Sequence, residues 1–514
     1  MKFRNTTNHR QFGINVSSNV LAYGVNLLIG LWLTPYLITK LGVESYGLYP
    51  LANSVTSYMS LITLALNGAY GRYLAIDMQR KAITDANKTF NTSLFGSIII
   101  TTISLPFVIG FVFAIPYVFN IPLGQENNTQ ILFFLIMISF FVTTIESCFS
   151  VSTWAKSRFD LQNIVIISSQ LFRLLCIVII FQLTNPNIWI VGLAMLLSSM
   201  LGLFGNFYFW RKLTPELRIN YRHFDRSRVN DLFSMGGWMV VNQIGALLFQ
   251  STSLIIANIS LGVKIAGEYG SIILFSSLLR GLSSTASSVL TPMVLEKYAM
   301  NDLSRISSLS TQAIRLLGIT IGIPVGLICG FGKPILSLWL GESFSHLWLL
   351  LGITLIYLPF NLAVTPLFAI QTTLNKVKLP GIMSLIFGII NIFLALVFIE
   401  KFNLGAIGIA GAGAIVLTMK NALFTPIYGA TIQKNPWYTY LKSLIPGLVV
   451  SISIIIISIG FLQFFEIDKW LELILLLGIT SCISLLLIYV FVLKIEDKKF
   501  FQSFIPGFND FAGK

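Results

Sequence analysis

Four basic residues lie inside long hydrophobic stretches of this chain: Arg173, Arg280, Arg315 and Lys420. A cation at the depth of a bilayer costs several kcal/mol unless it faces water, a partner or the interior of a helix bundle. Few carboxylates lie deep enough to pair with these residues. We therefore expect the four side chains to line a cationic internal cavity, which would suit a negatively charged substrate that enters or crosses the membrane.

Two further charged residues could take part in such a site. Glu146 is the clearest carboxylate within a hydrophobic stretch. It could couple a proton or a sodium ion to transport or pair with one of the cations, and we favour the ion pair because a single carboxylate is weak support for a relay. Arg72 lies at the mouth of the second hydrophobic stretch. It could receive a charged headgroup first, although anchoring of the helix at the membrane surface explains it almost as well.

The composition indicates an all-α integral membrane protein. Of 514 residues, 55% are hydrophobic and 11% are charged, and the mean hydropathy is +0.81. A soluble protein of this length could not bury so much apolar surface. The hydrophobic runs are continuous, whereas the strands of a membrane β-barrel would alternate apolar and polar residues.

Motifs for cofactors, metals and nucleotides do not occur in the sequence. The four cysteines, Cys148, Cys176, Cys329 and Cys482, have no CxxC spacing, so we expect neither a disulfide nor a metal site. There is no HExxH and no Walker-type motif. The net charge of +14 arises largely from short loops beside hydrophobic stretches, which indicates contact with lipid headgroups and not with nucleic acid.

A spanning helix needs about 20 mostly apolar residues, and the first stretch is expected to be retained as a helix and not cleaved. The sequence predicts about 14 such helices: 12–38, 46–68, 90–115, 129–151, 161–183, 187–210, 232–258, 266–291, 306–331, 346–370, 379–399, 405–430, 441–463 and 470–493.

The distribution of basic residues predicts the orientation of these helices. If the N-terminus is cytoplasmic, 25 of the 34 lysines and arginines fall in inward segments and five in outward ones, and the other four are the intramembrane cations. Such an excess follows the positive-inside rule. We therefore expect a multi-pass protein with both termini in the cytoplasm.

A weak internal repeat predicts two lobes. Leu41-Gly42-Val43 followed by Tyr46-Gly47 is echoed by Leu261-Gly262-Val263 followed by Tyr269-Gly270. The repeat predicts two pseudo-symmetric six-helix lobes, with the substrate held between them. The predicted divisions are an N-terminal lobe (1–210), a basic cytoplasmic loop (211–231), a C-terminal lobe (232–432) and a last part (433–514) that holds two further helices and a cytoplasmic tail.

Short motifs along the whole chain resemble a known family. They are TPYLITKLGVESYGLY (34–49), LNGAYGRYLA (66–75), RFDLQN (158–163), ILSLWLG (335–341) and QTTLNKVKLP (371–380). The chain resembles the Wzx-type polysaccharide-export flippases, which share a superfamily with lipid II flippases and MATE multidrug exporters. Family members often have twelve helices, and a further pair occurs in longer members.

The resemblance implies two lobes around a central cavity. It also implies a secondary transporter of the bacterial inner membrane that moves polyprenyl-pyrophosphate-linked oligosaccharide units to the outer leaflet, by alternating access, for surface polysaccharides such as O-antigen. The pyrophosphate would bind Arg173, Arg280, Arg315, Lys420 and Arg72. Implied partners are membrane lipids and a polysaccharide polymerase. The serines and threonine at 276–277, 283–285 and 287–288 could contact sugars, although close packing of helices is favoured.

Two alternatives belong to other classes. A MATE-type, cation-coupled exporter of drugs or metabolites would favour acidic groups in its cavity, and the intramembrane cations disfavour it. A membrane polymerase or glycosyltransferase would commonly need a long outward loop, whereas the outward segments are short, so we expect a protein that is not an enzyme. In the absence of an ATP motif, transport would depend on a proton or sodium gradient, or on consumption of the substrate outside.

Overall fold

The structure is a computed structural model that describes residues 3–225, 238, 240–288, 303–493 and 497. These residues are helical almost throughout, and no strand occurs among them, which confirms the predicted all-α class. The helices form two compact units. Unit 1 comprises Met1–Ser271 and Gly381–Glu400, and unit 2 comprises Ile272–Pro380 and Lys401–Lys514.

Unit 1 contains the N-terminal helices, one complete later helix and parts of two others. Its elements are α1 (Phe3–Leu41), α2 (Val43–Ser57), α3 (Ser60–Gln79), α4 (Ile83–Val118), α5 (Glu126–Ala155), α6 (Phe159–Leu183), α7 (Ile188–Leu213), η1 (Tyr221–His223), α9 (Thr252–Leu261), the start of α10 (Val263–Ser288) and most of α17 (Lys378–Glu400).

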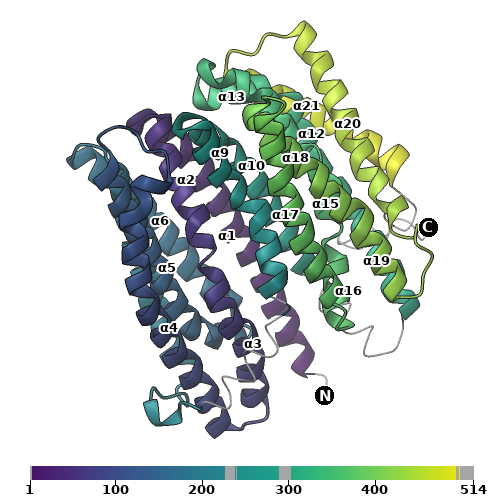
Figure 1. Ribbon diagram of the computed structural model, residues 1–514. Coiled ribbons are helices and arrows are strands. Elements are labelled where there is room, and N and C mark those ends of the chain that lie inside the picture. Colours follow the sequence, from purple (N-terminus) through teal and green to yellow (C-terminus); the bar gives the residue numbers. More distant parts are fainter. Residues whose placement is uncertain (1–2, 226–237, 239, 289–302, 494–496, 498–514) are drawn as a thin grey trace. The chain divides into compact units, whose positions relative to one another are not determined.

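Unit 2 contains the rest of α10 and the later helices (Figure 1). Its further elements are α12 (Leu303–Gly330), α13 (Gly332–Leu340), η2 (Glu342–Leu347), α14 (Trp348–Leu355), α15 (Leu358–Ala363), α16 (Thr365–Thr373), α18 (Gly405–Thr418), η3 (Met419–Phe424), α19 (Thr425–Ile432), α20 (Leu441–Phe464), α21 (Trp470–Leu487) and η4 (Ile488–Val492).

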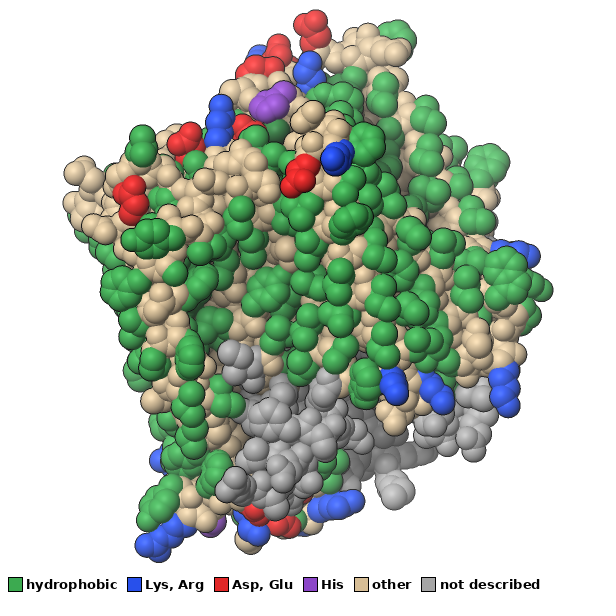
Figure 2. All heavy atoms as spheres, in the orientation of Figure 1, with side chains coloured by type: hydrophobic (Ala, Val, Ile, Leu, Met, Phe, Trp, Pro, Cys, Tyr) green, Lys and Arg blue, Asp and Glu red, His purple; other side chains and the backbone are tan. Residues whose placement is uncertain are grey.

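The helices have the surface expected of spanning segments. Within the described residues, 12 segments are long and apolar enough to cross a membrane. They match the predicted spans except 46–68, which is divided between α2 and α3, and 266–291, which lies largely in the serine-rich α10. On the face shown in Figure 2, hydrophobic side chains cover the helices and charged side chains gather toward helix ends. Phe107 is 75% exposed and Phe113 is 67% exposed, as suits contact with lipid.

The repeated glycine motif folds in the same way at both places. Gly42 separates α1 from α2 with φ 81°, and Gly262 separates α9 from α10 with φ 91°. Only glycine adopts this backbone conformation without strain, so each repeat places a sharp break between two helices. The compact units do not follow the predicted lobe boundaries, because α9 and most of α17 associate with α1–α7. The lobe boundaries stay a prediction.

Aromatic side chains hold α4, α5 and α7 of unit 1 together. Trp210 is fully buried and stacks on Phe90, with ring centroids 5.2 Å apart. Phe149 meets Trp210 edge-on at 5.3 Å. Such pairs contribute about 0.5–1.5 kcal/mol beyond the burial of their area. This cluster fixes α5 and α7, which contribute residues to the pocket described below.

Two asparagines of α4 bind the backbone of the chain that follows α7. The Asn87 amide donates to the Glu216 carbonyl at 3.1 Å and accepts from the Arg218 amide at 2.8 Å. Asn91 donates to the Arg218 carbonyl and accepts from the Asn220 amide, both at 2.8 Å. The first part of the predicted basic loop 211–231 is therefore fixed to α4, while residues 226–231 lie outside the described residues.

A stripe of four glycines on α12 allows close contact with α20 in unit 2. Gly318, Gly322, Gly326 and Gly330 recur every fourth residue. A Cβ atom built on Gly322 would lie 2.7 Å from the Gly447 carbonyl oxygen, and one on Gly330 would lie 2.4 Å from the Ser458 Cβ. Small residues let helix backbones approach closely inside membranes, where dispersion contacts drive association. The stripe thus holds α20 on α12.

A buried ion pair joins α12 to Asp497. The Arg315 guanidinium donates from Nε to Oδ2 of Asp497 at 2.7 Å and from Nη2 to Oδ1 at 2.6 Å. Arg315 is 4% exposed and Asp497 is fully buried. Gln312 donates a third bond to the same carboxylate at 3.3 Å. The guanidinium group of Arg315 therefore binds a carboxylate from the C-terminal part of the same chain.

Adding a methyl group to the glycine stripe should weaken unit 2. In Gly326→Ala the new Cβ would lie 2.7 Å from the Ile454 Cβ and 2.9 Å from the Ser451 carbonyl oxygen. Overpacking of this kind costs about 1–3 kcal/mol, so we expect a lower unfolding temperature of the purified protein in detergent. Gly460→Ala on α20 is the control, because its Cβ would meet nothing within 4 Å. Equal unfolding temperatures for the two variants would contradict the packing role.

Removing Arg315 alone should destabilise the protein more than removing both members of its ion pair. Arg315→Met leaves the Asp497 carboxylate buried without its partner, which costs about 3–5 kcal/mol. Arg315→Met combined with Asp497→Leu should recover most of the unfolding temperature of the purified protein and the function measured in cells. A double variant that is stable but inactive would instead support the prediction that Arg315 contacts the substrate.

Candidate functional site

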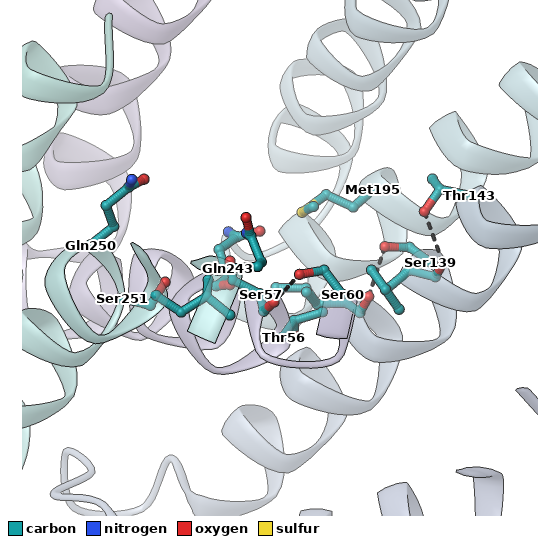
Figure 3. Close-up of a pocket in the computed structure, with 13 residues that line it drawn as sticks. Thr56, Ser57, Ser60, Ser139, Thr143, Met195, Gln243, Gln250 and Ser251 are labelled. Carbon is teal, nitrogen blue, oxygen red and sulfur yellow. Dashed lines mark hydrogen bonds between the residues drawn. The ribbon is translucent and has the colours of Figure 1, made fainter. Parts of the chain in front are cut away.

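An uncharged polar pocket of about 430 Å³ lies within unit 1 (Figure 3). Its volume falls in the range of about 300–1,000 Å³ that is typical of small-ligand sites. The described residues that line it include no charged side chain: Asn53, Thr56, Ser57, Ser60, Ile136, Ser139, Phe140, Thr143, Met195, Gln243, Leu247, Gln250 and Ser251. None of the predicted cations lines this pocket, so it is a site that we did not predict, and the cationic cavity stays a prediction.

The pocket forms where two helical segments are interrupted. The first break falls at Tyr58 and Met59, between α2 and α3, and the second falls at Ser251, immediately before α9. The Tyr58 hydroxyl binds Thr252 Oγ1 and donates to the Leu247 carbonyl at 3.3 Å, so the two breaks are joined. Interrupted helices that turn polar groups toward a cavity are typical of binding sites in transporters.

Most hydroxyl groups of the pocket donate their protons to the backbone of their own helix. Ser57 donates to the Asn53 carbonyl at 2.8 Å, and Thr143 donates to the Phe140 carbonyl at 2.8 Å. Ser139 does the same with the Ile136 carbonyl, and Ser60 at the start of α3 donates across the break to the Ser57 carbonyl of α2. Their oxygen lone pairs stay available as acceptors.

Three other groups of the pocket have polar atoms that the described residues leave unbonded. Thr56 is 6% exposed, and its Oγ1 atom has no hydrogen-bond partner within the described part of the chain. The amides of Gln243 and Gln250 make no hydrogen bond to other described side chains or backbone groups. A buried polar group without a partner is costly, and this applies to Thr56, whereas Gln243 is partly buried and Gln250 is exposed. The pocket is therefore prepared for a polar ligand or for water.

Two cations lie with polar side chains in unit 2. We call this group the Arg280 cluster, and its members are Arg280, Lys420, Ser276 and Tyr357. Arg280 donates from Nε to the Ser276 hydroxyl at 3.3 Å and interacts with the Tyr357 hydroxyl. Arg280 and Lys420 lie close enough for their like charges to repel each other. Their predicted place in a cationic, substrate-binding cavity stays a prediction.

Lys420 is carried by a short π-helical segment. Residues Met419–Phe424 form η3, in which the wider turn replaces the regular α-helix between α18 and α19. Asn421 in this segment donates to the Asn361 side chain of α15, which anchors the distorted turn. The Lys420 ammonium lies 5.8 Å from the centroid of the Phe368 ring. Single π-turns occur frequently at functional sites.

The remaining predicted cations are found in three different settings. Arg315 is bound to Asp497, so the structure does not group it with the Arg280 cluster. Arg173 lies on α6 in unit 1 and is partly buried, and its Nε atom has no partner within the described residues. Arg72 lies on α3, and its side chain is outside the described part of the chain.

Glu146 on α5 is bound by an asparagine. The Asn206 amide on α7 donates to its carboxylate at 2.7 Å. A Cβ built on Gly202 would lie 2.8 Å from the same oxygen, so the glycine makes room for the carboxylate. Within the ranges that the structure describes, no basic side chain lies within salt-bridge distance of Glu146. The favoured ion pair is therefore not seen there, and ion coupling stays a prediction.

The hydroxyl groups of α10 serve largely to pack helices. Ser283 donates to the Leu362 carbonyl at 3.2 Å and lies 3.1 Å from the Thr365 hydroxyl. Thr285 donates to the Gly281 carbonyl of its own helix at 3.0 Å. This agrees with the packing alternative that we favoured from the sequence.

The polar pocket was missed in the sequence, although a signal for it exists. Asn53 and Ser57 are spaced i and i+4, and Gln243 and Gln250 are spaced i and i+7. These spacings place side chains on one face of a helix. Two polar faces in segments that are otherwise apolar could have indicated a shared cavity. Asp497 was missed for another reason, since it was assigned to the cytoplasmic tail.

Comparison with known proteins identifies the family. A model described as polysaccharide biosynthesis protein matches residues 12–297. An uncharacterized membrane protein EpsK of Bacillus subtilis (strain 168) is 32% identical over 464 residues, which cover 90% of this chain and 92% of the relative. A putative O-antigen transporter of Shigella flexneri is 22% identical over 405 residues, which cover 78% of this chain and 94% of the relative.

Solved structures share the fold at low identity. The lipid II flippase MurJ in an inward closed conformation has a TM-score of 0.65 at 16% identity, covering 92% of this chain and 98% of its own. An inward-facing MATE family multidrug transporter has a TM-score of 0.59 at 15% identity, covering 87% of this chain and 98% of its own. Together with the sequence matches, these likenesses confirm the predicted resemblance to Wzx-type exporters: the chain belongs to the polysaccharide biosynthesis protein family.

Proposed function

We propose that this protein is a flippase for polyprenyl-pyrophosphate-linked oligosaccharides. It transfers these lipids from the cytoplasmic to the outer leaflet of the bacterial inner membrane for surface polysaccharide synthesis. Both of its termini lie in the cytoplasm, and it changes no covalent bond of its cargo. The family match and the relative named as a putative O-antigen transporter support this assignment.

The observation that carries the proposal is a pair of basic residues among the helices of unit 2: Arg280 binds the Ser276 hydroxyl, and Lys420 lies in the π-helical turn η3 beside the Phe368 ring. Two like charges in a medium of low dielectric raise the free energy of the protein. A pyrophosphate would offset this repulsion, because its oxygens accept hydrogen bonds from both cations at once. A transporter for cationic drugs would gain nothing from such a pair. Arg173 of unit 1 is proposed as a further contact for the cargo, with Arg72 at the cytoplasmic entrance.

Transport would proceed by alternating access, and unit 1 offers a contact that would open in this cycle. Asn120 and Asn258 bind each other reciprocally, each through its side-chain amide and the partner's backbone at 2.6–3.0 Å. Nearby in the sequence, Gly47 of α2 meets Gly267 of α10, where a Cβ would lie 2.7 Å from the opposite Cα. By the predicted orientation, this contact lies on the outer side and joins the two sequence halves.

The driving force would come from an ion gradient or from removal of the cargo outside. Glu146 is the proposed ion-coupling residue, because it is a carboxylate in a spanning helix that is held by a neutral amide. A proton or a sodium ion would neutralise it and change its bond with Asn206. A polysaccharide polymerase that consumes the oligosaccharide on the far side is the proposed partner for transport without such coupling.

Deleting the gene in the native host should cause an intact lipid-linked oligosaccharide to accumulate on the cytoplasmic leaflet. Plasmid-borne wild-type protein should clear this lipid, as measured by extraction and by protection from an enzyme added outside. Arg280→Ala and Arg173→Ala should each reduce clearance by about 10- to 100-fold, the loss of one charge-assisted contact. Absence of lipid accumulation would overturn the flippase proposal.

The control for this experiment is Lys212→Ala, which removes an exposed cation next to Tyr208 at the end of α7. It should clear the lipid at the wild-type rate. Arg280→Lys should retain part of the activity if charge alone matters and lose most of it if the guanidinium fork binds phosphate. Full clearance by a protein with both Arg280→Ala and Arg173→Ala would remove the anion site from the proposal.

Joining Asn120 to Asn258 should stop transport. In a protein whose four native cysteines are replaced, Asn120→Cys with Asn258→Cys and a short thiol cross-linker should lose lipid clearance in inverted vesicles. Each single cysteine variant treated in the same way should stay active. A cross-linked protein that transports at the wild-type rate would show that this contact does not open during the cycle.

A further inference from the structure

We infer that the uncharged pocket of unit 1 binds the neutral sugar units of the cargo, separately from the cations that bind its pyrophosphate. This inference rests on the proposed function and adds a second subsite to it. The pocket is lined by α2, α3, α5, α7 and the helical segment Val240–Leu261, all within unit 1. Arg280 and Lys420 belong to unit 2.

The hydrogen-bonding state of the pocket favours a ligand that can both donate and accept. The hydroxyl groups of Ser57, Ser60, Ser139 and Thr143 give their protons to backbone carbonyls and present lone pairs only. An anion, which can only accept, would find few donors beside these oxygens. The amides of Gln243 and Gln250 supply both donors and acceptors. A sugar hydroxyl fits this set because it does both.

The absence of charged side chains among the described lining residues indicates that the ligand is neutral where it meets the pocket. A cationic ligand would find no carboxylate among the described residues of the pocket, and an unpaired charge is expensive in surroundings of low dielectric. A neutral ligand avoids this penalty. Phe140 and Met195 add apolar surface between the polar groups, which suits the C–H faces of a pyranose ring.

The buried Thr56 hydroxyl gives independent support for a ligand. It lines the pocket, it is 6% exposed, and its oxygen has no hydrogen-bond partner among the described residues. Leaving such a group unsatisfied costs about 1–3 kcal/mol. Thr56 lies beside the α2–α3 break, and a sugar hydroxyl would supply the partner that its oxygen lacks.

The test compares two lipids on the same purified protein in nanodiscs. One is the lipid-linked oligosaccharide extracted from the deletion strain, and the other is undecaprenyl pyrophosphate without sugar. The wild-type protein should bind the sugar-bearing lipid about 10-fold or more tightly than the bare lipid. Gln243→Leu and Thr143→Val should each lower this ratio by about 2- to 10-fold, the range of one neutral hydrogen bond.

Matched variants separate a sugar site from a general defect. Thr102→Val removes a hydroxyl that bonds its own helix in the same way, to the Ile98 carbonyl at 2.7 Å, but it lies on α4 outside the pocket. It should leave both affinities unchanged. Thr143→Ser keeps the hydroxyl group, so it should keep the wild-type ratio of the two affinities. Arg280→Ala should weaken both lipids by the same factor and leave the ratio as it was.

The outcomes distinguish the inference from the proposed function. If Gln243→Leu and Thr143→Val leave the ratio at its wild-type value, or weaken both lipids equally, the sugar subsite is overturned and the flippase proposal stands. Failure of the wild-type protein to bind either lipid would overturn the flippase proposal, and the sugar subsite with it.

Discussion

The absence of water from the core of a bilayer governs where polar side chains occur in this protein. A hydroxyl, amide or charged group inside a spanning helix needs a partner from the protein itself, because lipid offers none. Most such groups find one locally. Thr101 and Thr354, for example, donate to carbonyls of their own helices at 2.9 and 2.7 Å. Such residues contribute to helix structure and do not indicate a binding site.

Some of the polar groups to which function is assigned depart from this pattern. Thr56 keeps an unbonded oxygen in a buried position, the Gln243 amide bonds to no described group, and Arg280 is held near a second cation. The buried Thr56 oxygen is costly for the empty protein, and a suitable ligand would give each of these groups a partner. The two classes of group differ, since hydroxyls and amides gather in unit 1 and the close pair of cations lies in unit 2. This division parallels the two chemical parts of a sugar pyrophosphate lipid.

Much of the fold could be predicted from the sequence, because hydrophobic length and charge depend on neighbouring residues. The all-α class and most spans follow from such local patterns, and the Gly42 break recurs at Gly262 as the repeat indicated. The second and eighth spans were less regular because serines and helix breaks dilute their hydrophobicity. Partners distant in the chain were harder to foresee. Arg315 binds a carboxylate 182 residues away, and no spacing rule connects the two positions.

The glycine stripe of α12 has a consequence for how chains of this family acquire additional helices. Where Gly447 of α20 lies against Gly318 and Gly322, backbone meets backbone without side chains between them. A chain that ended after α19 would leave that strip facing acyl chains, with no side chains to fill the groove. Selection would then favour leucine or isoleucine at those positions. Glycines at four-residue intervals in this helix should therefore distinguish long members from short ones in an alignment, before any count of their C-terminal segments.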